Sequence, residues 1–206
     1  MSTIMENTMQ TDKPNRRKTV VSGDAQTLLL KAVDELFYQE GARAVGVEAV
    51  VRKAGVNKMS LYRQFSSKDA LLMEYLKRRD ERYWLYMEAS LAKHDGQPRK
   101  QLLQLFTDFV ERAAKSDYRG CPFVNIAVEF TDASHPARIL VAGNKQRLLA
   151  LLNRFAEASR AKDPPLLAAG LALLLEGAYT ATQTYGFGND LIRQLPTLAE
   201  QMIAHA

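Results

Sequence analysis

Hydrophobic side chains recur along most of this chain at intervals of three and four residues, the spacing of one face of an α-helix. The first such stripe runs over 29–37, and Gly41 follows where a helix can close on a left-handed residue. A strand could be drawn over 123–128, but Pro122 just before it favours the first position of a helix. The pattern therefore predicts an all-α chain.

Glycine, proline and capping residues divide the C-terminal part into further helices. Asp163 is the expected N-cap of an apolar helix that runs to about Thr184, and a last helix is interrupted or begun at Pro196. About nine helices result. The expected breaks are Gly96-Gln97-Pro98, Gly120-Cys121-Pro122, His135-Pro136, Asp163-Pro164-Pro165, and Gly186 with Gly188.

Two short helices around a tight turn are predicted within 46–65. Val47, Val50 and Val51 mark the inner face of the first helix, which Gly46 can begin. In the turn, 54–56, a small residue allows close approach, a glycine allows positive φ and a valine plugs the core. This is the pattern of a helix-turn-helix, whose second helix enters the major groove of DNA.

The second of these helices is expected to begin at the N-cap Asn57 and to bury Leu61 and Phe65. A longer helix follows, capped by a serine at 66–67, with Asp69 near its positive end. Five side chains of the second helix are left facing outward: Lys58, Met59, Ser60, Tyr62 and Arg63.

Charge is distributed unevenly between the two parts of the chain. Residues 13–68 hold eleven basic and five acidic side chains, whereas 83–206 hold thirteen and twelve. A basic segment next to a nearly neutral one indicates a polyanionic partner for the first segment, although a solvated basic surface gives the same counts. We expect a disordered basic arm over 1–21, a DNA-binding domain over 22–82 and a second domain over 83–206.

The stretch from Phe37 to Leu71 resembles the TetR (tetracycline repressor) family of regulators. The resemblance rests on Phe37, Gly41, Val47, Val50, Ala54-Gly55-Val56, Lys58, Leu61-Tyr62, Phe65, Ser67-Lys68 and Leu71. Two positions depart from the family pattern: Gly46 stands where Thr or Ser is usual, and Gln64 where an aromatic residue or His is common. The second departure puts one backbone or phosphate contact in doubt.

The resemblance implies sequence-specific binding to double-stranded operator DNA, with an inverted repeat read by a homodimer. It implies phosphate contacts for Tyr62 and Lys68, while Met59 and Ser60 are the candidates for reading base edges. On an isolated helix, Lys58 and Arg63 would be ordinary solvated side chains. The DNA-binding candidates are Gly46, Val47, Asn57, Lys58, Met59, Ser60, Tyr62, Arg63 and Lys68.

The family resemblance also implies a ligand cavity in the C-terminal domain, for a mostly apolar or aromatic small molecule that releases the DNA. Aromatic residues there are numerous, although each one alone is better explained as core. Cys121 is a candidate redox sensor, but a small buried residue is the simpler interpretation. The effector-pocket candidates are Trp84, Phe106, Phe109, Cys121, Asn125, Glu129 and Tyr179.

The last two helices are expected to pair with a second copy of the chain, with Leu167, Leu171, Leu174, Ala178 and Leu198 as interface candidates. The apolar run 166–175 is about half the roughly 20 residues of a spanning helix, so no membrane contact is expected. One cysteine and no signal peptide indicate a cytoplasmic protein, and the family resemblance implies the bacterial cytosol.

The predicted function is a transcriptional regulator, a repressor that a small molecule releases. The alternative is a DNA-binding regulator without a small-molecule effector, controlled by a protein partner or by oxidation of Cys121. An enzyme is not expected, because no nucleophile motif or phosphate-cradling loop is present. No cofactor and no metal site are expected, because three histidines and one cysteine lack metal-ligand spacing.

Overall fold

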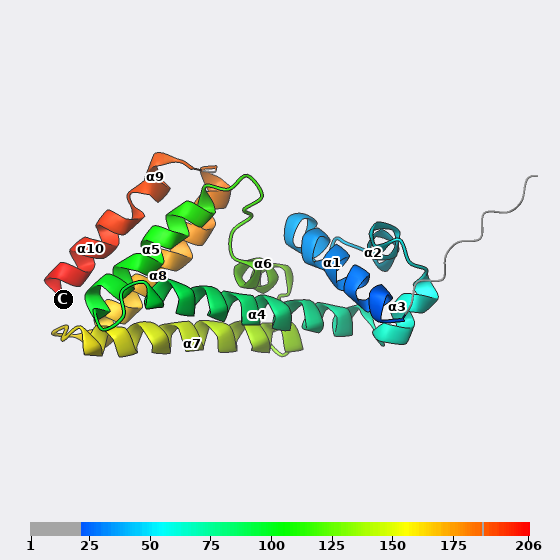
Figure 1. Ribbon diagram of the computed structural model, residues 1–206, viewed down its shortest axis with the longest axis horizontal. Coiled ribbons are helices and arrows are strands. Elements are labelled where there is room, and N and C mark those ends of the chain that lie inside the picture. Colours follow the sequence, from blue (N-terminus) through cyan, green and yellow to red (C-terminus); the bar gives the residue numbers. More distant parts are fainter. Residues whose placement is uncertain (1–21, 187) are drawn as a thin grey trace, which may run out of the picture.

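A computed structural model of the chain describes residues 22–186 and 188–206, and within these ranges it contains helices, turns and loops but no strand (Figure 1). The all-α prediction is therefore confirmed for the described part of the chain. The predicted basic arm, 1–21, lies outside the described residues. The helices are α1 (Ser22–Glu40), α2 (Val47–Ala54), α3 (Lys58–Gln64), α4 (Lys68–Ala92), α5 (Pro98–Ala113), α6 (Pro122–Glu129), α7 (Pro136–Ala158), α8 (Pro164–Thr184), α9 (Asp190–Arg193) and α10 (Leu195–His205).

The helices form an elongated molecule with a small head of α1, α2 and α3 at one end (Figure 1). The long helices α4 and α7 run side by side through the body, and α5, α8 and α10 pack at the end opposite the head. Helix α4 belongs to both parts, since it begins in the head and ends in the body. The domain boundary expected at 82/83 falls inside α4, so a continuous helix joins head and body.

Several helices begin where the sequence placed a capping residue. The side chain of Asn57 accepts a hydrogen bond from the backbone N–H of Ser60 at 2.8 Å, which starts α3. Ser67 accepts one from Ala70 at 3.0 Å and starts α4, and Asp163 starts α8. These side chains satisfy N–H groups that the first turn of a helix leaves without partners. Near Pro196 the last segment is divided into the short α9 and the longer α10.

Helix α8 is apolar on nearly all sides, and its two faces have different surroundings. Its inner face packs against α7 and α10 and buries Leu171 and Leu175. Its outer face leaves Leu166 and Leu173 exposed at 69% and 72%. Within the described residues α8 is the one helix that is long and apolar enough to cross a membrane, a test that the core helix of a globular protein also meets.

Candidate nucleic-acid interface and ligand cavity

The head has the geometry of a helix-turn-helix. Gly55 closes α2 with φ of 67°, in the left-handed region that a glycine enters without strain. The next residue, Val56, donates its N–H to the carbonyl of Val51 at 3.1 Å and turns the chain into α3. Leu61 is completely buried and Phe65 nearly so, which anchors α3 to the core. The opposite face of α3 is therefore fixed toward solvent.

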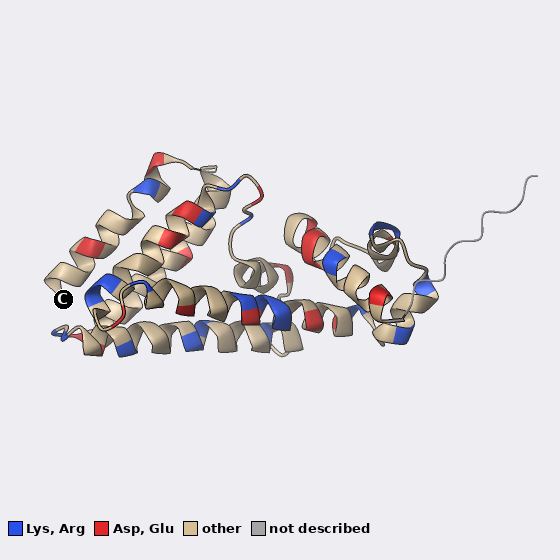
Figure 2. Ribbon diagram, viewed as in Figure 1, with Lys and Arg blue, Asp and Glu red and all other residues tan. Residues whose placement is uncertain are grey.

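The predicted DNA contacts gather on this outer face. Met59 is 75% exposed and Tyr62 49% exposed, with the exposed Lys58 and Arg63 beside them and Ser60 partly covered. Figure 2 shows basic residues along both α2 and α3 of the head. The remaining candidates lie at the edges: Gly46 and Asn57 are N-caps, Val47 is partly buried against the core, and Lys68 opens α4.

Several polar side chains of this surface already have partners within the chain. Lys58 pairs with Glu48 of α2 at 2.5 Å, and this hydrogen bond raises the pKa of the lysine. Lys68 donates to the carbonyl of Arg43 at 3.2 Å, and partial burial lowers its pKa. Arg63 donates to the hydroxyl of Ser60 at 3.1 Å. DNA would have to exchange some of these contacts for contacts to phosphates or bases.

Polar contacts from α4 and α6 hold the head on the body. Asp34 of α1 forms ion pairs with both Arg79 and Arg82 of α4. At the end of α6, the Glu129 carboxylate accepts the backbone N–H of Arg43 at 2.8 Å, in the loop that leads into α2. The Arg43 guanidinium donates back to the Glu129 carbonyl at 3.0 Å. These contacts link the entry of the helix-turn-helix directly to the body.

A second connection runs from the end of α1 to the loop between α5 and α6. The hydroxyl of Tyr38 accepts the backbone N–H of Arg119 at 2.7 Å and donates to the carbonyl of Gly120 at 3.0 Å. The guanidinium of Arg119 returns a hydrogen bond to the carbonyl of Tyr38 at 3.1 Å, and Gln39 reaches the carbonyl of Asp117 at 2.8 Å. A movement of this loop would therefore act on α1.

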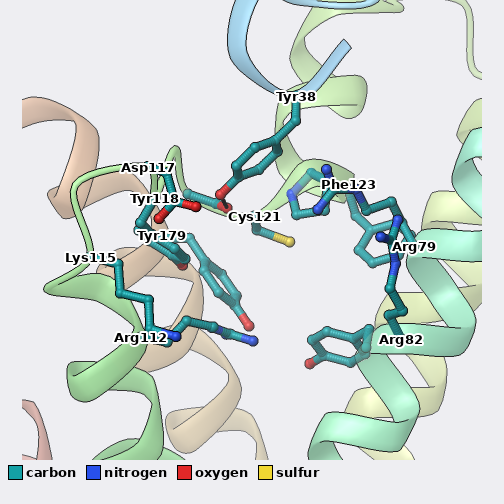
Figure 3. A pocket seen from close by; sticks show the side chains of 13 residues that line it. Tyr38, Arg79, Arg82, Arg112, Lys115, Asp117, Tyr118, Cys121, Phe123 and Tyr179 are labelled. Atoms are coloured by element: carbon teal, nitrogen blue, oxygen red, sulfur yellow. Dashed lines mark hydrogen bonds between the residues drawn. The ribbon is translucent and has the colours of Figure 1, made fainter. Parts of the chain in front are cut away.

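A cavity of about 290 Å³ lies at this junction, near the lower end of the usual range for ligand sites (Figure 3). Its walls come from α1, α4, α5, α6, α8 and the loop that precedes α6. In Figure 3 the side chains of Tyr38, Arg112 and Tyr179 point toward the same space. The full lining is Tyr38, Arg79, Arg82, Tyr83, Arg112, Lys115, Asp117, Tyr118, Gly120, Cys121, Pro122, Phe123 and Tyr179.

Two of the seven predicted pocket residues, Cys121 and Tyr179, line this cavity. Phe106 and Phe109 of α5 do not line it; both are buried in the hydrophobic core. Trp84 is also placed elsewhere: it lines a separate groove between α4 and α7, where Arg147 covers its ring at 3.9 Å. These three rings therefore lie outside the junction cavity.

The two polar pocket candidates on α6 have other roles. Asn125 donates to the carbonyl of Arg119 at 3.0 Å and accepts from Gln183 at 3.3 Å, so it braces the loop beside the cavity. Glu129 faces the head rather than the cavity. One turn of helix separates the two side chains, but they do not share a space.

The sequence-based prediction missed most of the charged lining, above all Arg112. This arginine follows Phe109 by three residues on α5, so it stands within the apolar stripe of an amphipathic helix. An arginine in such a stripe was the signal that could have found the site. Tyr38 gave no comparable signal, because its position is set only when α1 docks on the loop before α6.

The predicted dimer contacts also need correction. Leu167, Leu171 and Ala178 are buried within the chain itself, 4%, 0% and 5% exposed, so they are not available to a partner. Leu174 is partly covered by the same core. Leu198 of α10 is 42% exposed, and the free apolar positions on α8 are Leu166 and Leu173. Helical periodicity did not separate the two faces because both are apolar.

A recognition helix held outward on the head, which α4 joins to a helical body, defines a helix-turn-helix regulator. The chain belongs to the TetR family. The family model for bacterial regulatory proteins of the tetR family matches residues 29–75, and the tetracyclin repressor-like C-terminal domain model matches 97–195. It is a DNA-binding regulator of transcription.

Individual relatives agree with this assignment. A putative TetR-type regulator from Streptomyces avermitilis is 32% identical with a TM-score of 0.71, over 86% of this chain and 97% of its own. A TetR-family regulator from Streptomyces coelicolor shares the fold with a TM-score of 0.79 and 24% identity, over 88% and 87% of the two chains. The transcriptional repressor NemR of Escherichia coli is 25% identical over 138 residues, 66% of this chain and 69% of NemR.

Proposed function

We propose that this chain represses transcription from an operator and leaves the operator when a small molecule enters the cavity at the junction of head and body. Tyr38 is the observation that carries the proposal. It belongs to α1 of the head, yet it lines the cavity and holds the loop before α6 through two hydrogen bonds. A ligand against this ring would bias the position of the head, which is what an effector must do.

On the DNA side, the proposed division of labour follows the exposure of α3 and the start of α4. Met59 and Ser60 read base edges in the major groove, through apolar contact with a thymine methyl group and through a hydroxyl hydrogen bond. Tyr62 and Lys68 bind phosphates, and Lys58 and Arg63 add charge along the groove. Gly46, Val47 and Asn57 position the backbone at the ends of the two short helices.

The active form proposed is a homodimer in the bacterial cytosol. The exposed face of α8, with Leu166 and Leu173, and the exposed Leu198 of α10 would lie against the same helices of a second chain. A two-fold dimer reads an inverted repeat, with half-sites about one helical turn apart.

The experiment begins by selecting operator sequences from random duplexes with the purified chain, followed by a screen of small molecules for loss of DNA fluorescence anisotropy. We expect a ligand that weakens operator binding by roughly 5- to 150-fold, the usual range of coupling. Operator DNA must weaken binding of the same ligand by an equal factor, which isothermal titration calorimetry measures. Trp84 can report entry of the ligand, since its ring lies 5.2 Å from that of the cavity residue Tyr83.

A different outcome would favour control without a small-molecule effector. If oxidation releases DNA from the native chain but not from Cys121→Ser, and no small molecule does so, the regulator is a redox sensor. Cys121 is 3% exposed and its sulfur accepts a hydrogen bond from Lys145 at 3.6 Å. If neither agent acts, the effector proposal is wrong and a protein partner takes its place.

A further inference from the structure

Arg112 projects into the junction cavity without a carboxylate partner. Within the described residues no acidic side chain forms an ion pair with it, and its Nε atom is buried without a hydrogen bond. Its guanidinium instead lies over the ring of Tyr86, 4.2 Å from the centroid, and near Tyr118 at 5.8 Å. Aromatic faces offset only part of the free energy lost when a charge leaves water.

The rest of the lining does not supply the missing negative charge. Four cationic side chains line the cavity and Asp117, which is exposed, is the one carboxylate among the lining residues. Arg79 and Arg82 share a single partner, Asp34, so one positive charge of this group is left over. The nearby Lys145 is neutralised by Glu176 at 2.6 Å. The cavity therefore has an excess of positive charge.

A hydrogen-bond donor and flat apolar surfaces complete the site. The hydroxyl of Tyr118 is buried without a hydrogen-bond partner within the described part of the chain. Burial raises its pKa, so it remains a protonated donor. The rings of Phe123 and Tyr83 meet edge to face, 5.9 Å apart, beside the ring of Tyr179. Such walls suit a planar body, and about 290 Å³ limits it to a small one.

The geometry points to a small aromatic carboxylate as the ligand of this cavity, with its carboxylate on Arg112 and its ring against the walls formed by Tyr83, Phe123 and Tyr179. This inference rests on the proposed function and adds the ligand class to it. A guanidinium binds a carboxylate through two parallel hydrogen bonds, which no neutral ligand of the same shape can reproduce. The anion would also supply the counter-charge that Arg112 lacks.

The test compares aromatic carboxylates with their primary amides on the native full-length chain. The probes are benzoate and its hydroxyl- and methyl-substituted forms, each paired with the matching benzamide, and binding is measured by calorimetry. We expect at least one carboxylate to bind with micromolar to millimolar affinity and its amide roughly 30-fold more weakly, the effect of losing a buried charge pair. Equal binding of acid and amide, or no binding of any acid, would overturn the ligand class.

Variants test whether Arg112 holds the carboxylate. Arg112→Gln should weaken binding of the acid by a similar factor and leave binding of the amide unchanged. Arg193→Gln, on the exposed α9, removes the same charge and should change the affinity for neither compound. Full affinity in Arg112→Gln would overturn the site. If that variant does not fold by circular dichroism, the comparison of acid and amide on the native chain still decides the class.

Operator release separates this inference from the proposed function. A carboxylate that binds through Arg112 without releasing DNA would contradict the effector role and leave the ligand class standing. A neutral molecule that releases DNA by binding in this cavity, while no aromatic carboxylate binds there, would support an effector and contradict the ligand class.

Discussion

At the scale of single residues, the DNA contacts proposed for α3 and for the first residue of α4 are of two kinds. Lys68→Ala should weaken binding to every DNA sequence and lower the slope of log affinity against log salt by about one unit, because one phosphate contact is lost. Met59→Ala and Ser60→Ala should instead relax the preference at particular operator positions. Anisotropy titrations on operator and random duplexes over a range of salt make the comparison, and equal losses on both duplexes for all three variants would contradict it.

The hydroxyl of Tyr38 provides a test of the coupling between ligand binding in the cavity and DNA binding by the head. Tyr38→Phe keeps the ring in the cavity wall but removes the hydroxyl that bridges Arg119 and Gly120. We expect a loss of stability of about 1 kcal/mol per hydrogen bond and a smaller factor by which effector weakens operator binding. The exposed Tyr185→Phe is the matched control. An unchanged coupling factor in Tyr38→Phe would place the path between cavity and DNA elsewhere.

At the scale of elements, an ion pair near the turn between α4 and α5 ties these two helices together. The buried Asp108 of α5 accepts hydrogen bonds from Lys93 at 2.7 and 2.8 Å and from Gln104 at 2.5 Å. Burial would raise the pKa of Asp108, but these hydrogen bonds outweigh it and hold the pKa below the ordinary value. The ionised form is therefore favoured in the folded chain.

This depressed pKa gives the stability of the chain a pH dependence with a definite sign. The stabilisation is present above the ordinary aspartate pKa of about 4 and is lost as the pH falls through the lower folded value. Asp108→Asn should reduce the free energy of unfolding by roughly 1–3 kcal/mol at pH 7. Urea denaturation of the native chain and of Asp108→Asn at pH 7 and near pH 3 measures this loss. An equal loss of free energy of unfolding at both pH values would contradict the charge-based explanation.

The same scale shows what could be predicted from the sequence. Helix starts are local, since Asn57, Ser67 and Asp163 cap helices through an N–H only three residues ahead, and each was recognisable from its neighbours. The cavity could not be predicted in this way. Its walls come from segments far apart in the chain, so Tyr38 and Arg112 become part of one site only through tertiary packing.

Aromatic content was also a poor guide to the cavity. Aromatic rings fill cores as readily as they line ligand sites, and Phe106 and Phe109 were used for the core. The informative residue was the charged one, Arg112. Burying a charge on an apolar stripe costs free energy, so such a residue suggests a function other than packing.

At the scale of the whole molecule, we propose that the outer face of α8 determines the state of association. Leu173→Asp should give folded monomers, because it places a charge in the proposed interface on a side chain that is 72% exposed in the single chain. Leu85→Asp, at a 65% exposed leucine of α4, should remain dimeric. Sedimentation velocity distinguishes the two, and a dimeric Leu173→Asp would move the interface elsewhere.

The ion pair between Lys58 and Glu48 has a consequence for how the regulator searches a genome. The Glu48 carboxylate pairs with the Lys58 ammonium group as a phosphate would, so it competes with DNA phosphates for this lysine. Weak encounters with random sequence must first displace it, whereas base contacts at the operator can offset the exchange. Glu48→Gln should therefore raise affinity for random duplexes more than for the operator. Competition titrations with excess random DNA would register this as a longer dwell on wrong sites and a slower arrival at the right one.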